Sequence, residues 1–155
     1  MFTKKETERK MNFCVIKSML NDFGLLHGGE LFKMMDTVAG YCSKDFSGFP
    51  SLTKSVNNFT FLEPAYEGDK IRITGIIDYT GRTSMEVYLK AEVPEKDNAM
   101  IASGYFTMVA IDRDMKATEV PKLILESEED RMYNRQAIQR RNINKSIDMS
   151  KERIK

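Results

Sequence analysis

One stretch decides the fold of this chain: Asn21-Asp22-Phe23-Gly24-Leu25-Leu26-His27-Gly28-Gly29-Glu30-Leu31-Phe32-Lys33-Met34-Met35-Asp36. Its first half is rich in Asn, Asp and Gly, which is typical of a loop. From Glu30 onward the apolar residues recur at helical spacing as far as Cys42. We therefore expect a loop that leads into a helix from Glu30 to about Lys44, ended by the turn Gly48-Phe49-Pro50.

The segments that flank this helix have the character of strands. Residues 71–79 and 85–93 alternate with a period of two and are separated by a turn at Gly81-Arg82. Residues 101–111 are apolar on both parities, which predicts a central strand with both faces covered. Residues 52–61 are also strand-like, and a shorter first strand is expected at residues 13–19. Consecutive strands with short turns indicate an antiparallel sheet with the helix packed on one face, an α+β arrangement.

Two local features refine this outline. In the segment 52–61, Val56 and Phe59 fall on opposite parities, which a bulge at Asn57-Asn58 would reconcile. Residues 126–144 predict a polar helix that begins with acidic residues and ends with basic ones, in accord with the helix dipole. Ser127 followed by Asp130 resembles a capping box at its start.

Composition limits the class of protein. The chain has 155 residues, which suits one domain, and a net charge of +1, which provides no strong field toward nucleic acid or a membrane. Cys14 and Cys42 belong to no Cys-x-x-Cys pair, so we expect free thiols in a reducing compartment. With no apolar run of about 20 residues and no signal-peptide core, we expect a soluble cytoplasmic protein.

The stretch 21–36 also resembles the signature of the hot-dog-fold acyl-CoA thioesterases, in which Asn and Gly precede Gly-Gly and a helix that carries Met-Asp. Three further segments resemble that family in the same order: Phe61-Leu62-Glu63-Pro64 with Gly68-Asp69, the hairpin 81–87, and 106–112 with Val120-Pro121. Residues 126–141 resemble its charged terminal helix. The resemblance covers residues 12–141. It departs from the family at Thr37, Asn57 and Thr60, where relatives often carry acids.

The resemblance implies a fold and an activity. The fold is a hot-dog fold, in which an antiparallel sheet wraps around one central helix, with an extra C-terminal helix. Residues 1–11 would then be an N-terminal extension, 12–122 the hot-dog domain and 123–155 a charged helical tail. The activity is hydrolysis of acyl-CoA to a carboxylic acid and CoA, without a further cofactor because CoA is part of substrate and product. Relatives pair as homodimers and assemble as trimers of dimers.

The chemistry assigns expected roles within this frame. By resemblance Asp36 is the catalytic carboxylate, as general base or as nucleophile. Gly28 and Gly29 precede the helix, where unpaired N–H groups at its start can stabilise an oxyanion. Asp36 lies eight residues beyond Gly28, or ~12 Å along the axis at 1.5 Å per residue, so one thioester carbon cannot contact both in one chain. An antiparallel pair of helices across a two-fold axis would bring them together, which predicts an obligate dimer with composite sites.

Further residues are expected to contact the substrate. Asn21 matches a polar loop residue of the family that orients water or thioester, although a turn-forming Asn would look the same. His27 is the single histidine, and with no Gly-x-Ser-x-Gly elbow it is expected to shape the pocket. The turn Gly81-Arg82-Thr83-Ser84 offers a guanidinium and two hydroxyls suited to phosphate, and by resemblance it contacts the nucleotide or pantetheine of CoA. No cluster has metal-ligand spacing.

Three other functions compete with this hypothesis. A protein of the same fold could bind acyl-CoA or an acyl carrier without hydrolysing it. Hydration or dehydration of acyl thioesters also occurs on this fold, but it normally uses His and Glu in another motif. Nucleic-acid binding through the basic end of the tail is disfavoured, because the acidic start of the same segment offsets those charges.

Overall fold

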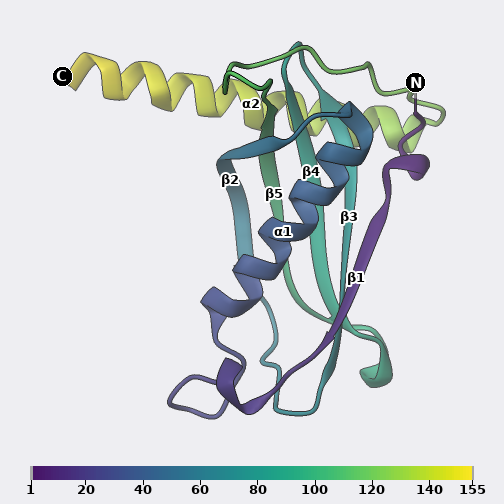
Figure 1. Cartoon of the computed structure of the whole chain (residues 1–155), viewed down its shortest axis with the longest axis vertical. Helices are drawn as coiled ribbons and strands as arrows, with labels where there is room; N and C mark the ends of the chain where they lie inside the picture. The colour runs from purple at the N-terminus through teal and green to yellow at the C-terminus, as the bar shows by residue number, and fades with distance from the viewer. Residues whose placement is uncertain (1, 155) are drawn as a thin grey trace.

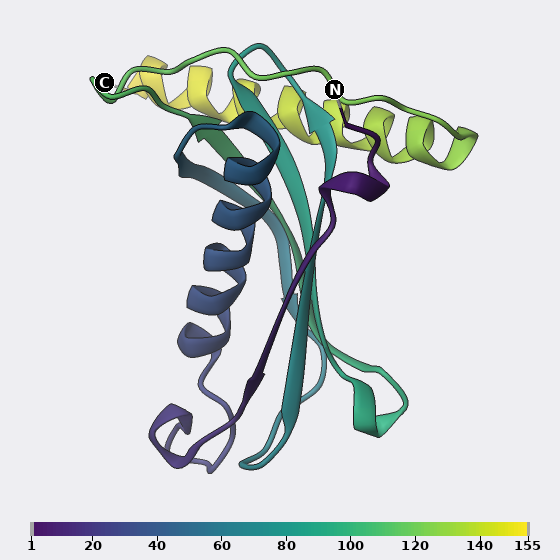
Figure 2. The ribbon, with the colours of Figure 1, turned by 45° about the vertical axis from the view of Figure 1, so that its right-hand side comes forward.

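A 20-residue helix, α1 (Gly28–Ser47), lies across one face of a five-stranded antiparallel sheet in the computed structural model, which describes residues 2–154 (Figure 1). The strands run in the order β1 (Arg9–Cys14), β3 (Lys70–Thr80), β4 (Ser84–Val93), β5 (Ala99–Ala110) and β2 (Ser51–Phe61). A second helix, α2 (Glu128–Ile154), crosses the opposite face (Figures 1 and 2). The expected α+β arrangement, with a sheet around one central helix and an extra C-terminal helix, is confirmed.

Helix α1 forms because one stripe of its side chains is apolar and both of its ends are capped. Leu31, Met35, Val38 and Cys42 are buried against the sheet. The helix begins at Gly28, two residues earlier than expected, because His27 caps it, and it continues three residues beyond Lys44. Gly48 ends it in the left-handed region, at φ 80°, and donates its N–H to the Lys44 carbonyl.

The core lies between α1 and the concave face of β3, β4 and β5. Its largest fully buried side chains include Ile73, Ile77, Leu89 and Phe106. Gly75 permits the close approach of helix and sheet, because a Cβ there would lie 2.8 Å from the Cys42 sulfur. The short distance from α1 to the sheet therefore depends on this glycine.

The strand predictions are confirmed for β2 to β5, within two residues at their ends, and wrong for the first strand. The bulge in β2 is present: the register against β5 shifts between Asn57 and Thr60, and Asn58 has φ 50°. The first strand spans Arg9–Cys14, whereas residues 17–19 form a 3-10 turn, η2 (Lys17–Met19). β1 pairs with β3 from Arg9↔Gly75 onward, so the sheet extends to the charged Arg9 and Lys10, ahead of the half-buried Met11 and Phe13.

Helix α2 is fixed to the convex face of the sheet by polar contacts. The Arg140 guanidinium donates to Glu86 at 2.6 Å and lies 3.7 Å from Asp78, and its carbon lies 3.6 Å from the centre of the Tyr105 ring. At its start, the Ser127 hydroxyl accepts the Asp130 N–H at 3.0 Å, the capping contact predicted from the sequence. The helix spans Glu128–Ile154 and is therefore ten residues longer at its C-terminal end than the predicted segment.

No helix in residues 2–154 combines the length and apolar character needed to cross a membrane.

Candidate active site

Asp36 lies in the third turn of α1, beside the edge strand β2. Its carboxylate is half-buried, and its Oδ1 accepts a hydrogen bond from the Thr53 hydroxyl at 2.5 Å. The same hydroxyl lies 3.5 Å from the Met108 sulfur. One carboxylate oxygen is thereby fixed by β2, which orients the other for chemistry. The sequence alone does not distinguish Thr53, because only the packing of β2 against α1 brings its hydroxyl to Asp36.

The two glycines at the start of α1 differ in their hydrogen bonding. The Gly29 N–H donates to Nδ1 of His27 at 2.9 Å, and the Glu30 and Leu31 N–H groups donate to the His27 carbonyl. Among the described residues, the Gly28 N–H has no hydrogen-bond partner. Of the two glycines, Gly28 therefore keeps the N–H without a partner among the described residues, and His27 caps the helix.

Asn21 and Gly28 share a hollow of about 440 Å³ whose other walls include Leu31, Phe61 and Pro64. A Cβ on Gly28 would lie 3.0 Å from the Phe61 ring, so a side chain there would push against that wall. The Asn21 Oδ1 accepts the N–H groups of Phe23 and Leu25, at 2.9 and 3.1 Å. Asn21 thus forms the turn that shapes this loop while it lines the hollow.

Asp36 does not line that hollow in the same chain. Eight residues of helix separate it from Gly28, which is about 12 Å along the axis. Strand β2, which holds Thr53 beside Asp36, is the last strand of the sheet. Its side chains Leu52 and Phe61 are 49% and 56% exposed, and Phe32 of α1 beside it is 36% exposed. Apolar exposure of this extent along a sheet edge is typical of an interface.

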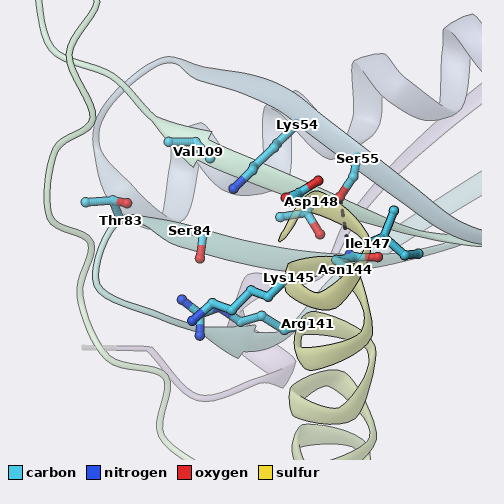
Figure 3. Close-up of a pocket in the computed structure, with 11 residues that line it drawn as sticks. Lys54, Ser55, Thr83, Ser84, Val109, Arg141, Asn144, Lys145, Ile147 and Asp148 are labelled. Carbon is cyan, nitrogen blue, oxygen red and sulfur yellow. Dashed lines mark hydrogen bonds between the residues drawn. The ribbon is translucent and has the colours of Figure 1, made fainter. Parts of the chain in front are cut away.

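The hairpin between β3 and β4 is closed by a hydrogen bond from the Gly81 N–H to the Ser84 carbonyl, 2.8 Å long. Arg82 is exposed and lies 3.9 Å from Glu119. Thr83 and Ser84 line a second hollow of about 280 Å³, the hairpin hollow, under the C-terminal half of α2 (Figure 3). Of the hairpin residues expected to bind phosphate, Thr83 and Ser84 line this hollow, whereas Arg82 does not.

Three cationic side chains enter the hairpin hollow from elements that are distant in sequence: Lys54 of β2, and Arg141 and Lys145 of α2 (Figure 3). In the part of the chain that the structure describes, none of the three forms an ion pair, although Asp148 shares the hollow. The sequence showed these residues only as surface charge, since their convergence depends on how α2 crosses the sheet. Cations and hydroxyls in one hollow suit a phosphate group.

Two further observations concern the thiol of Cys42 and possible metal ligands. Burial raises the pKa of the Cys42 thiol to about 12, which keeps it protonated. Within residues 2–154, no group of three His, Cys, Asp or Glu side chains is placed to hold a metal ion.

Comparison with known proteins gives one consistent family. The model of the thioesterase superfamily matches residues 23–97. Protein VdlD from Helicobacter pylori is 33% identical over 77% of this chain and 70% of its own length. An acyl-CoA thioester hydrolase from Bacillus subtilis, YkhA, is 28% identical over 81% of this chain and 75% of its length. The structure of an acyl-CoA hydrolase from Staphylococcus aureus, solved with butyryl-CoA and CoA, matches this chain with a TM-score of 0.86. The two sequences are 25% identical, and the match covers 97% of this chain and 92% of the hydrolase chain.

Proposed function

The chain belongs to the thioesterase superfamily, and on that premise we propose that it hydrolyses acyl-CoA thioesters with Asp36 as the catalytic carboxylate. The observation that carries this proposal is the hydrogen bond from Thr53 to Asp36. A solvent-facing Asp in a helix has no need of a partner from a neighbouring strand. A carboxylate held at one oxygen is positioned to act with the other.

The reaction needs an attack on the thioester carbonyl and a place for the negative charge that develops on its oxygen. Asp36 acts either by taking a proton from the attacking water or by attacking the carbonyl carbon itself. The free N–H of Gly28 stabilises the oxyanion, a contribution of about 3–4 kcal/mol for one donor in other enzymes. If water attacks, the C–S bond breaks, the carboxylic acid is formed, and the CoA sulfur takes the proton that Asp36 accepted. If Asp36 attacks, the CoA thiolate leaves first and an acyl–Asp36 anhydride forms, and water then hydrolyses that anhydride to the carboxylic acid and supplies the proton of the CoA thiol.

We infer a dimer as the minimal active unit, because Asp36 and Gly28 of one chain are too far apart to act on one carbon. Antiparallel pairing of two β2 edges would continue the sheet and set the two α1 helices in opposite directions. Asp36 of each chain would then face Gly28 and Asn21 of the partner subunit. The exposed Phe61 and Phe32 beside β2 would be buried in this interface, where they can form the wall of the acyl channel. Assembly into trimers of dimers is the further expectation from the family resemblance.

The hairpin hollow is the proposed site for a CoA phosphate. The Ser84 and Thr83 hydroxyls and the charges of Lys54, Arg141 and Lys145 provide the donors that a phosphate requires. The Staphylococcus aureus hydrolase, solved with CoA, supports a CoA ligand for this fold. The assignment of the CoA phosphate to these residues is our proposal. The Arg141→Met variant is expected to raise KM for acyl-CoA and to leave KM for acyl-pantetheine, which lacks the nucleotide, unchanged.

The direct test is release of free thiol from acyl-CoAs that range from acetyl to palmitoyl, measured for the wild type and for Asp36→Ala. Loss of a positioned acid–base group costs about 10²–10⁴-fold in rate, so we expect kcat to fall by that factor. Asp45→Ala is the matched control, because Asp45 lies on the same helix and pairs with Arg9 at the surface.

Wild-type turnover that Asp36→Ala retains would contradict the assignment of Asp36. Absence of turnover on every acyl-CoA, with tight binding retained, would contradict the enzyme hypothesis and leave an acyl-CoA-binding protein.

A further inference from the structure

Two asparagine side chains join strand β2 to helix α2 beside the hairpin hollow. The Asn57 Nδ2 donates to the Asn144 Oδ1 at 2.8 Å, and the Asn144 Nδ2 donates to the Asn57 Oδ1 at 2.9 Å. We name this pair the amide clasp. Asn144 also lies 3.5 Å from the Ser55 hydroxyl, and both residues line the hollow (Figure 3). Because hydrogen bonds are directional, two reciprocal bonds fix both the distance and the orientation of the two side chains.

The clasp lies next to a second irregularity of β2, which turns two consecutive residues toward the hollow. The register against β5 shifts between Thr53 and Ser55, so Lys54 is the additional residue of a bulge. Neighbours in a regular strand point to opposite faces, whereas Lys54 and Ser55 both line the hairpin hollow. Thr53, one residue earlier, points to Asp36. The bulge therefore directs Lys54 into the hollow without moving Thr53 away from the carboxylate.

Helix α2 brings two more cations to the same hollow, one on each side of the clasp in the sequence. Arg141 precedes Asn144 by three residues, and Lys145 follows it directly. With Lys54 they place three positive charges around one negative charge, that of Asp148. Like charges repel, so these residues favour separation of α2 from β2. The clasp is neutral, and it opposes this repulsion without an ion pair that would occupy one of the cations.

A different kind of contact fixes α2 one turn earlier. The Arg140 guanidinium donates to the Glu86 carboxylate at 2.6 Å, and neither residue lines the hairpin hollow. Arg140 and Asn144 are four residues apart and therefore lie on the same face of the helix. The segment that carries Arg141 and Lys145 is thus held at two points. The ion pair lies away from the hollow, and the neutral clasp lies at its wall.

We propose that Asn57 and Asn144 are positioning residues of the CoA phosphate site, whose clasp holds Arg141 and Lys145 opposite Lys54 at the spacing that a phosphate of the CoA nucleotide requires. This inference rests on the phosphate role proposed above for the hairpin hollow. The clasp acts through the cations. A site whose charges are already in place loses less free energy in ordering side chains when the ligand binds.

The test uses adenosine 3′,5′-bisphosphate, which carries the 3′-phosphate and the first 5′-phosphate of the CoA nucleotide, in calorimetric titration of the full-length protein. Asn144→Leu removes the clasp and places a residue that helices favour in α2. We expect it to bind the probe about two- to tenfold more weakly, the factor that one ordinary hydrogen bond contributes. Asn142→Leu, at an exposed position of the same helix, is the matched control and should leave the affinity unchanged.

Two double variants separate positioning from a general loss of structure. Asn57→Leu combined with Asn144→Leu should bind the probe no more weakly than either single variant, because both remove the same clasp. In an Arg141→Met background, Asn144→Leu should weaken the probe by a smaller factor than in the wild type, because one of the cations that it positions is gone.

Four results would overturn the proposal: no binding of the probe by the wild type, unchanged affinity in Asn144→Leu, multiplication of the two factors in the double clasp variant, or an equal factor with and without Arg141. The probe has no thioester, so its binding is measured without turnover. A failure of the proposed hydrolysis would therefore be a separate result, seen in thiol release and not in this titration.

Discussion

At the scale of single residues, the proposed chemistry depends on a carboxylate and the hydroxyl that orients it. The proposed role of Asp36 follows from its place in the Gly-Gly and Met-Asp stretch. Thr53 could not be identified from the sequence, because no local pattern distinguishes it from other threonines on a strand. Its role depends on the register of β2 and the packing of that strand against α1, which are properties of the folded chain.

The contribution of Thr53 can be measured with Thr53→Val, which keeps the shape of the side chain and removes the hydroxyl. A hydrogen bond to a charged group is worth about 1.5–3 kcal/mol, so we expect kcat to fall by about ten- to a hundredfold. KM should change little, because the hydroxyl contacts Asp36 rather than the ligand. Thr60→Val, an exposed position on the same strand, is the control. Equal loss of activity in both variants would mean that the strand, and not the hydrogen bond, is responsible.

A second residue-scale prediction concerns pH. The pKa of Asp78 is raised in the folded protein, so the folded state binds this proton more tightly than the unfolded state does. Its contribution to stability is complete below the unfolded pKa, near 3.8, and is lost as pH rises through the folded pKa. Asp78→Asn does not titrate. We therefore expect the wild type to lose stability relative to Asp78→Asn between pH 4 and neutral pH or above, measured by urea unfolding. A difference that is constant with pH would contradict a raised pKa.

At the scale of elements, apolar periodicity predicted what the core determines and missed what pairing and capping determine. Helix α1 was predictable from its buried stripe, and the bulge in β2 from the mismatch of Val56 and Phe59. The strand Arg9–Cys14 was misplaced because it lies at the edge of the sheet, where every second side chain is exposed to solvent. Its first residues, Arg9 and Lys10, are charged, so the apolar alternation is too short to recognise in the sequence. The full length of α2 was missed because a largely solvated helix has little apolar pattern to mark its end.

The attachment of α2 is predicted to depend on Arg140. Its guanidinium is the cationic partner of the buried Glu86 carboxylate and lies beside Asp78. Arg140→Met would leave buried charge without compensation, a change that costs about 3–5 kcal/mol in other proteins. We expect a loss of about that size in the free energy of unfolding. Arg135→Met, an exposed arginine of the same helix, should lose less than about 0.5 kcal/mol. Equal stability of the two variants would show that Arg140 does not hold the helix in place.

At the scale of the whole molecule, the two halves of the proposed site, Asp36 and Gly28, are too far apart in one chain to act on one substrate carbon. The spacing of Gly28 and Asp36 could be read from the sequence, and it led to the prediction of a dimer. The convergence of Lys54, Arg141 and Lys145 on the hairpin, and the contact of Arg140 with Glu86, could not be predicted from the sequence. Both depend on how α2 crosses the convex face, and long-range contacts of this kind leave no trace in local periodicity.

The central claim is that each active site combines Asp36 of one subunit with Gly28 of the other, and co-expression of Asp36→Ala with Gly28→Val tests it most directly. Each variant alone is expected to be inactive, because both sites of its homodimer lack one component. The mixed dimer retains one intact site out of two, so a statistical mixture should recover about a quarter of wild-type thiol release. If the mixture is as inactive as the separate variants while size-exclusion chromatography shows mixed dimers, the composite site is wrong.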